Sequence, residues 1–141
     1  MTLVEMLIVL AIVGISAGAV VLGLASTNRD TGVQTEANRF ADRLRLAADD
    51  VLTTGSPLSV TWTPTAYRFE SQTNLTEALA TPHRLSGGVR LTGPQDAGSA
   101  LIDPDGAAPP LNFTFRRGDQ AWRVLFDGLN AVSQPVQSGE A

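Results

Sequence analysis

The sequence predicts an α+β fold in which a long N-terminal helix packs on a small antiparallel β-domain. Three patterns support this fold class. Residues 6–25 are uncharged and apolar, residues 33–51 repeat apolar side chains at helical spacing, and from residue 58 onward apolar and polar side chains alternate with the period of a strand. With 141 residues, the chain has room for one modest domain besides this helix.

The apolar run MLIVLAIVGISAGAVVLGLA occupies residues 6–25, and Ser16 is its only hydrogen-bonding side chain. As a helix, a run of this length reaches about 30 Å, which matches the hydrocarbon core of a bilayer. A secretory signal peptide begins with basic residues and has a shorter apolar core, whereas the first basic residue here is Arg29. The run therefore predicts a transmembrane helix, and residues 1–28 are expected to form a transmembrane and assembly segment.

Glu5 lies at the front edge of this apolar run. An unpaired carboxylate at the centre of a bilayer costs about 2.5–3.5 kcal/mol. In an isolated helix Glu5 would lie in the headgroup zone. In a bundle of such helices the acid would be neutralised by the α-amino group of a neighbouring copy or relative, because it cannot comfortably fold back onto its own N-terminus. In that interpretation Glu5 fixes the register of assembly.

Gly14 and Gly18 form a pair of small residues four positions apart in the same run. Such a pair allows the backbone of a second helix to approach closely. Glycine is also common in membrane-spanning helices without any packing role. Both interpretations stay open from the residues alone.

Residues 29–55 are expected to form an amphipathic helix that packs on the globular domain. One face carries apolar side chains at alternating intervals of four and three, namely Val33, Ala37, Phe40, Leu44, Ala47 and Val51. The opposite face carries Glu36, Arg39, Asp42, Arg43, Asp49 and Asp50, which are expected to be solvated, with Glu36 and Arg39 as a pair at helical spacing. Residues 30–32 are a candidate helix break, and Gly55 followed by Pro57 should end the helix.

Residues 56–141 are expected to form a β-rich domain. A hairpin is predicted over residues 58–62 and 67–69, with further strands at 89–91, 100–102, 111–115 and 121–126 and a short final strand after Asn130. Residues 75–80 could form one helical turn, and residues 133–141 are expected to fray. The core of the clearest strand pair is expected to hold Phe113, Phe115, Trp122, Val124 and Phe126.

Enzymatic chemistry has little support in the sequence. Cysteine is absent, and the single histidine, His83, has no nucleophile motif to serve and is expected in a loop, so no catalytic residue is assigned. The stretch Asp103-Pro-Asp105-Gly106 is similar to part of a calcium loop, but aligning Gly106 with the loop glycine puts Leu101 and Asn112 where two ligands should be. A turn accounts for it better. We therefore predict no enzyme, no metal site and no cofactor.

The charge balance disfavours nucleic acid as a partner. After residue 28, ten arginines face thirteen acids, and the whole chain carries a formal net charge of −4. Phosphate binding generally needs a basic stripe. Arg116 and Arg117 form the one basic pair that could serve DNA, although two arginines in a hairpin turn are usually only solvated.

The N-terminal sequence MTLVEMLIVLAIVG resembles the mature N-terminus of type IV pilins and type II secretion pseudopilins. In that family a prepilin peptidase removes a leader, the new N-terminal residue is N-methylated, and the acid at position 5 aligns subunits in a filament. The resemblance thus implies Met1 as the processed and methylated residue and Glu5, Gly14 and Gly18 as assembly residues, although the family usually has Phe in place of Met1.

The rest of the chain is similar to one branch, the H-type minor pseudopilin (GspH) and its FimT/FimU-like relatives. The similarity rests on the sequences at residues 44–57, 67–69, 83–89 and 122–130. It implies a pilin-like structural subunit of the periplasmic pseudopilus in type II secretion, anchored in the bacterial inner membrane by a single pass. The partners would be other major and minor pseudopilins, the prepilin peptidase, membrane lipid and exported proteins. The alternatives are a minor type IV pilin acting in pilus assembly, adhesion or DNA uptake, and an anchored binding domain that never polymerises.

Overall fold

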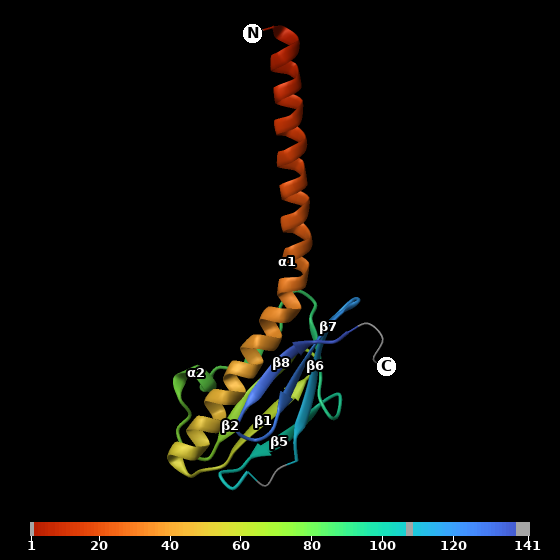
Figure 1. Ribbon diagram of the computed structural model, residues 1–141. Helices are drawn as coiled ribbons and strands as arrows, with labels where there is room; N and C mark the ends of the chain where they lie inside the picture. Colours follow the sequence, from red (N-terminus) through yellow and green to blue (C-terminus); the bar gives the residue numbers. More distant parts are fainter. Residues whose placement is uncertain (1, 107–108, 138–141) are drawn as a thin grey trace. The chain divides into compact units, whose positions relative to one another are not determined.

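The computed structural model describes residues 2–106 and 109–137, with the side chains of residues 18–31 left out of the description (Figure 1). The elements in chain order are α1 (Leu3–Thr54), β1 (Leu58–Thr63), β2 (Ala66–Ser71), α2 (Glu77–Ala80), β3 (His83–Arg84), β4 (Arg90–Thr92), β5 (Gly98–Ile102), β6 (Leu111–Arg117), β7 (Gln120–Phe126) and β8 (Ala131–Pro135). The chain forms two compact units, Met1–Thr31 and Gly32–Ala141. The predicted division into residues 1–28, 29–55 and 56–141 stays a prediction.

Helix α1 runs without interruption from Leu3 to Thr54. The predicted break at residues 30–32 is wrong, because this stretch has helical backbone. Its one glycine costs only about 1 kcal/mol relative to alanine, and no proline removes a hydrogen bond. The predicted end is confirmed: Gly55 has a φ of 69° and donates its N–H to the Val51 carbonyl at 2.9 Å.

The strands of unit Gly32–Ala141 form two antiparallel four-stranded sheets, ordered β3-β2-β1-β5 and β4-β6-β7-β8. The hairpin predicted over residues 58–69 is β1 paired with β2, and the aromatic strand pair is β6 paired with β7. The other predicted strands and the helical turn are present with small shifts in their bounds. The prediction that the chain frays from residue 133 is wrong in part, because Ser133–Pro135 belong to β8 and pair with β7, while residues 138–141 lie outside the described chain.

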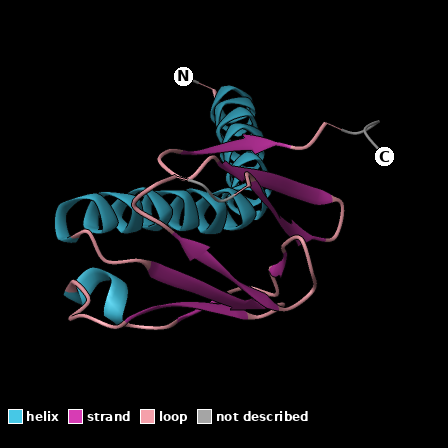
Figure 2. Ribbon diagram, turned by 90° about the horizontal axis from the view of Figure 1, so that it is seen from below, coloured by secondary structure: helices cyan, strands magenta, loops and turns pink. Residues whose placement is uncertain are grey.

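The second half of α1 packs against the sheets through its predicted apolar stripe (Figure 2). All six residues of that stripe are buried. Phe40 connects the two sheets, because its ring centroid lies 4.6 Å from that of Tyr67 on β2 and 4.8 Å from that of Phe113 on β6. Trp62 on β1 meets Phe113 edge to face at 5.1 Å. The helix and the two sheets therefore share a single aromatic core, in which Trp122 is only partly buried.

Candidate assembly site

The N-terminal part of α1 exposes apolar side chains on every side. Between residues 3 and 17, every described side chain is exposed, with Leu3 at 84% and Ile15 at 74%. Each fully exposed leucine or isoleucine forgoes about 1.5–3 kcal/mol of burial. A segment with this composition gains stability only by contacting something outside its own chain.

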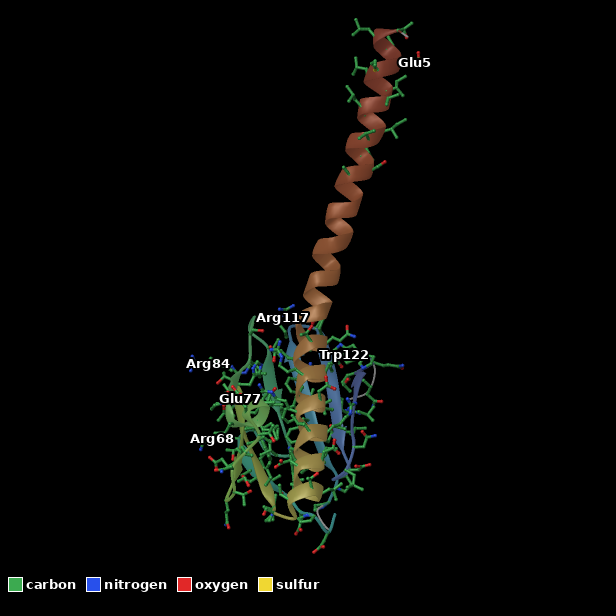
Figure 3. The ribbon with its side chains drawn as sticks, turned by 90° about the vertical axis from the view of Figure 1, so that its left-hand side faces the viewer. Glu5, Arg68, Glu77, Arg84, Arg117 and Trp122 are labelled. Atoms are coloured by element: carbon green, nitrogen blue, oxygen red, sulfur yellow. The ribbon has the colours of Figure 1, made fainter. Side chains whose placement is uncertain are left out.

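Glu5 is the only charged residue within this exposed segment, and its side chain projects from the first turn of α1 (Figure 3). Its backbone N–H donates to the Thr2 carbonyl at 3.1 Å and to Thr2 Oγ1 at 3.3 Å. Thr2 therefore acts as the N-cap, and Glu5 is at the third helical position, where a carboxylate is favoured by the helix dipole. These contacts fix the backbone of the first turn and leave the carboxylate available to a partner.

Gly14 faces open space, because a Cβ added there would meet no described atom within 4 Å. The hydroxyl of Ser16 donates to the Ile12 carbonyl at 2.8 Å, so its hydrogen-bond donor is satisfied within the helix. Gly18 lies among the residues whose side-chain surroundings are not described, and Met1 lies outside the described residues. Of the four predicted processing and assembly residues, only Glu5 and Gly14 are thus placed, both on exposed helix surface.

Within the described part of the chain, no helix combines the length and the apolar character needed to cross a membrane. The predicted span at residues 6–25 continues into residues 18–31, whose side chains are outside the description. It stays a prediction.

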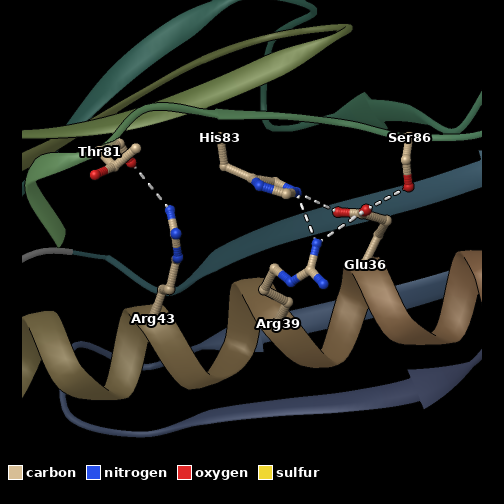
Figure 4. Close-up of polar contacts among 6 residues, drawn as sticks. All are labelled: Glu36, Arg39, Arg43, Thr81, His83 and Ser86. Carbon is tan, nitrogen blue, oxygen red and sulfur yellow. Dashed lines mark hydrogen bonds and ion pairs between the residues drawn. The ribbon is translucent and has the colours of Figure 1, made fainter. Parts of the chain in front are cut away.

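In unit Gly32–Ala141 the most concentrated polar contacts surround Glu36 (Figure 4). Its Oε2 lies 2.7 Å from Nε2 of His83, and its Oε1 accepts from Ser86 Oγ at 2.8 Å and lies 3.4 Å from Nη1 of Arg39. The predicted Glu36–Arg39 pair is therefore confirmed. These contacts tie α1 to β3 and to the loop that follows it, so that the helix is held by polar contacts beside its apolar stripe.

Two predictions about this cluster are wrong. Glu36 is not on a solvated face, since only 1% of it is exposed. His83 is not in a loop, since it belongs to β3 and pairs with Tyr67 of β2. A signal for the first was present in the sequence: position 36 is three residues after Val33 and four before Phe40, which places it at the border of the buried stripe.

The arrangement of Glu36, His83 and Ser86 does not form a catalytic relay. A relay needs a nucleophile bonded to the imidazole, which is bonded in turn to the acid. Here the hydroxyl of Ser86 and the imidazole of His83 both contact the carboxylate of Glu36. The group therefore positions the chain and prepares no nucleophile.

Tyr67 completes this region from the sheet side. Burial raises the pKa of its phenol, with Glu36 acting in the same direction and Arg43 opposing them. Within the described residues its buried hydroxyl has no hydrogen-bond partner. The guanidinium of Arg43 lies 5.8 Å from the Tyr67 ring centroid and donates to the Thr81 carbonyl at 3.2 Å. Arg43 thus links α1 to the segment between α2 and β3.

Arg116 and Arg117 are not in a hairpin turn as predicted, because both belong to β6. The turn consists of residues 118–119. Arg117 donates from Nη1 to the Gly87 carbonyl at 3.2 Å, and Cβ atoms added at Gly32 or Gly87 would come within 3.0 Å of the same nitrogen. Both glycines leave space for this guanidinium. Arg117 therefore fastens β6 to its neighbours, and only Arg116 of the predicted pair lies on exposed surface.

The stretch at residues 103–106 forms a turn, as predicted. Gly106 has a φ of 64° and donates its N–H to the Asp103 carbonyl at 3.1 Å. Asp103 Oδ1 accepts the N–H of Asp105 at 3.2 Å. The side chain of Asp103 is therefore occupied in shaping the turn.

Three comparisons relate this chain to known proteins. The family model described as "Type II transport protein GspH" matches residues 36–129, more than half of the chain. No curated protein matches the chain significantly. Among solved structures, the minor pseudopilin EpsH from the type 2 secretion system of Vibrio cholerae is similar, with a TM-score of 0.57 and 17% identity over 77% of this chain and 99% of that one. At this identity the likeness establishes the α+β, pilin-like fold.

The family match covers α1 from Glu36, every strand through β7 and the polar cluster that joins them. It selects type II secretion over the type IV pilus reading, and it makes the chain a structural rather than an enzymatic protein. The chain belongs to the GspH family of type II secretion minor pseudopilins.

Proposed function

We propose that this minor pseudopilin works by inserting its N-terminal helix among the helices of other pseudopilins. The observation that carries the proposal is the exposure of every described side chain in residues 3–17, nearly all of them apolar. Before assembly, the span at residues 6–25 would hold the subunit in the inner membrane by a single pass, with residues 56–141 in the periplasm. Assembly would exchange lipid contacts for helix contacts of similar apolar character.

In the assembled state the carboxylate of Glu5 would pair with the N-terminal amine of a neighbouring subunit. Two facts support this pairing: Glu5 is an isolated charge within an apolar surface, and its backbone is already fixed by Thr2. Removing a carboxylate and an amine from water together costs far less than removing either alone. Because the pair forms in one axial position only, it would set the register of the subunit.

The remaining residues of the proposed interface are Gly14 and Gly18, where a neighbouring helix would approach, and Met1, which would be the residue exposed by the prepilin peptidase and then N-methylated. The open space around Gly14 supports its part. The partners are other major and minor pseudopilins, inner-membrane lipid before assembly, and exported proteins as cargo.

The test compares Glu5→Ala with Glu77→Ala, which removes an exposed acid from the short helix α2. Each variant is expressed with its secretion partners, and the fraction that co-purifies with sheared pseudopili is measured. We expect Glu5→Ala to lose most incorporation and Glu77→Ala to keep it. Incorporation of Glu5→Ala at wild-type levels would reject the register role, and an absence of incorporation by wild type would favour an anchored domain that never polymerises.

A further inference from the structure

The outer face of the sheet β4-β6-β7-β8 has an unusual charge distribution. Arg90 of β4 and Arg116 of β6 are directly opposite each other in the register, and both are exposed. Arg123 of β7 lies on the same face, opposite Thr114. The other paired positions of this face are held by Thr92, Asn112, Ala121, Leu125, Val132 and Gln134, so the face carries three arginines and no acid.

A directly opposed pair of like charges destabilises a sheet. Within residues 2–106 and 109–137, neither the Arg90 nor the Arg116 guanidinium has a hydrogen bond or ion pair. In the other sheet, Arg68 on β2 pairs with Glu70 at 2.9 Å, whereas Arg84 on β3 is exposed and has no ion pair among the described residues, but it faces no second arginine across the strands. In a chain of net charge −4, acids are plentiful, yet none compensates Arg90 and Arg116 in the part described.

The same face ends in an apolar patch. Leu125 of β7 and Val132 of β8 form a cross-strand pair, and they are 40% and 48% exposed. A cavity of about 370 Å³ opens beside them. Pro110 and Asn130 border it, and so does Asp127, the one acid in its lining. Its volume accommodates a large aliphatic or aromatic side chain. The face therefore has a cationic end and an apolar end.

The distance between the two ends follows from the register. Leu125 is opposite Asn112, and Asn112 is four residues from Arg116 on β6. At about 3.3–3.4 Å per residue, the two ends are roughly 13 Å apart along the strands. An extended peptide that places an apolar side chain at the cavity would bring residues about four positions further along to the arginines.

We propose that this face docks a partner protein through an extended segment that carries an apolar anchor and, about four residues away, a cluster of carboxylates. Arginine binds carboxylates with two parallel hydrogen bonds, which makes an acidic segment the complementary occupant. Nucleic acid is a poorer occupant. Its negative charge continues along the whole strand, so phosphates beyond the arginines would face the rest of this acidic chain, and it carries no aliphatic side chain for the apolar end. The proposal does not depend on filament assembly, since the face belongs to unit Gly32–Ala141 alone.

The experiment uses the full chain in detergent micelles at low ionic strength and measures fluorescence anisotropy of labelled probes. The first probe is a short peptide with a leucine pair and a glutamate cluster four residues further along. The second replaces its glutamates by glutamine, and the third is a single-stranded oligonucleotide of equal charge. We expect the glutamate peptide to bind about tenfold more tightly than either control. Equal affinity for the glutamine peptide, tighter binding of the oligonucleotide, or no binding of the glutamate peptide would overturn the proposal.

Variants locate the binding. The double variant Arg90→Gln with Arg116→Gln should bind the glutamate peptide about tenfold more weakly, while its melting temperature stays level or rises because the like-charge pair is gone. Arg68→Gln is the matched control, since it removes an arginine from the other sheet, and its affinity should equal wild type. Unchanged affinity in the double variant would overturn the proposal. Tighter peptide binding by Glu140→Gln would also overturn it, because that result would mean that the arginines bind the Glu140 carboxylate of the same chain.

Discussion

Leu10 and Leu44 belong to the same helix, yet 69% of Leu10 is exposed and none of Leu44. Leu44 belongs to the aromatic core shared by α1 and the two sheets. Leu10 belongs to a stretch in which every described side chain is exposed. The unit Gly32–Ala141 therefore buries a hydrophobic core of its own, whereas residues 3–17 leave all of their described apolar side chains exposed. The two acids Glu5 and Glu36 differ in the same way, since the second has its partners within the chain.

The largest expected effect separates the two leucines. Leu44→Ala removes a buried side chain and should lower the free energy of unfolding by about 2–5 kcal/mol, whereas Leu10→Ala should change it by less than about 0.5 kcal/mol. Both are measured on the full chain in detergent by urea unfolding with tryptophan fluorescence. Trp62 and Trp122, the only two tryptophans, lie in the strands β1 and β7. A similar loss in both variants would contradict the division between the two regions.

The next effect separates the two acids. Glu36→Ala removes a buried carboxylate that accepts from the half-buried His83 and from the exposed Ser86, and it should cost about 1.5–3 kcal/mol. Glu5→Ala should leave the same unfolding curve unchanged, because Glu5 contacts none of the core. An unfolding curve for Glu36→Ala that overlays wild type would show that the cluster contributes nothing net.

A smaller effect is expected at the end of α1. Gly55→Ala places a Cβ in the left-handed region at a φ of 69°, which should cost about 1–2 kcal/mol. Gly14→Ala is the matched control, because Gly14 is within the helix with open space around it. There alanine should be neutral or stabilising in the unfolding assay, by up to about 1 kcal/mol. A loss at Gly14 equal to that at Gly55 would contradict this account of the two glycines.

The smallest effect is a pH dependence at the turn between β7 and β8. Asp127 Oδ1 accepts the N–H groups of Asn130 at 2.6 Å and Leu129 at 2.9 Å, and these bonds lower the pKa of Asp127 from 3.8. A lowered folded-state pKa means that the stabilisation is complete above pH 3.8 and is lost as the pH falls through the folded value. Asp127→Asn keeps an acceptor oxygen and should remove this contribution to the acid slope. An identical slope in the variant below pH 4 would count against it.

The sequence predicted the helix, the paired strands and the buried stripe because these follow from periodicity, which local residues carry. It could not predict that α1 continues through residues 30–32, since a single glycine leaves the balance to the flanking turns. It missed the burial of Glu36, which depends on a contact with His83 47 positions away, and the strand position of His83, which depends on its pairing with Tyr67. The pairing of Arg90 with Arg116 likewise appears only once the register of β4 and β6 is known.

For the candidate assembly site, the sequence alone supplied more of the description than the structure did. Glu5 and Gly14 were recognisable from an acid and a glycine in an apolar run, and the structure adds that both lie on exposed helix surface. The functions of Glu5, Gly14, Gly18 and Met1 stay predictions, because their proposed partners are atoms of other molecules. The local sequence identifies such a surface by its exposed apolar side chains and its isolated acid, whereas the partner is identified by experiment.

The most direct measurement is the distance from the Glu5 carboxyl carbon to the N-terminal amines of neighbouring subunits. Pseudopili would be assembled from this subunit with carbon-13 in its glutamate carboxyls and from partners with nitrogen-15, and the dipolar coupling measured by solid-state nuclear magnetic resonance. Our account predicts a coupling that corresponds to about 4 Å, the reach of an ion pair, and that disappears in Glu5→Gln prepared without the label at that position. A pseudopilus that incorporates the subunit and shows no such coupling would contradict it.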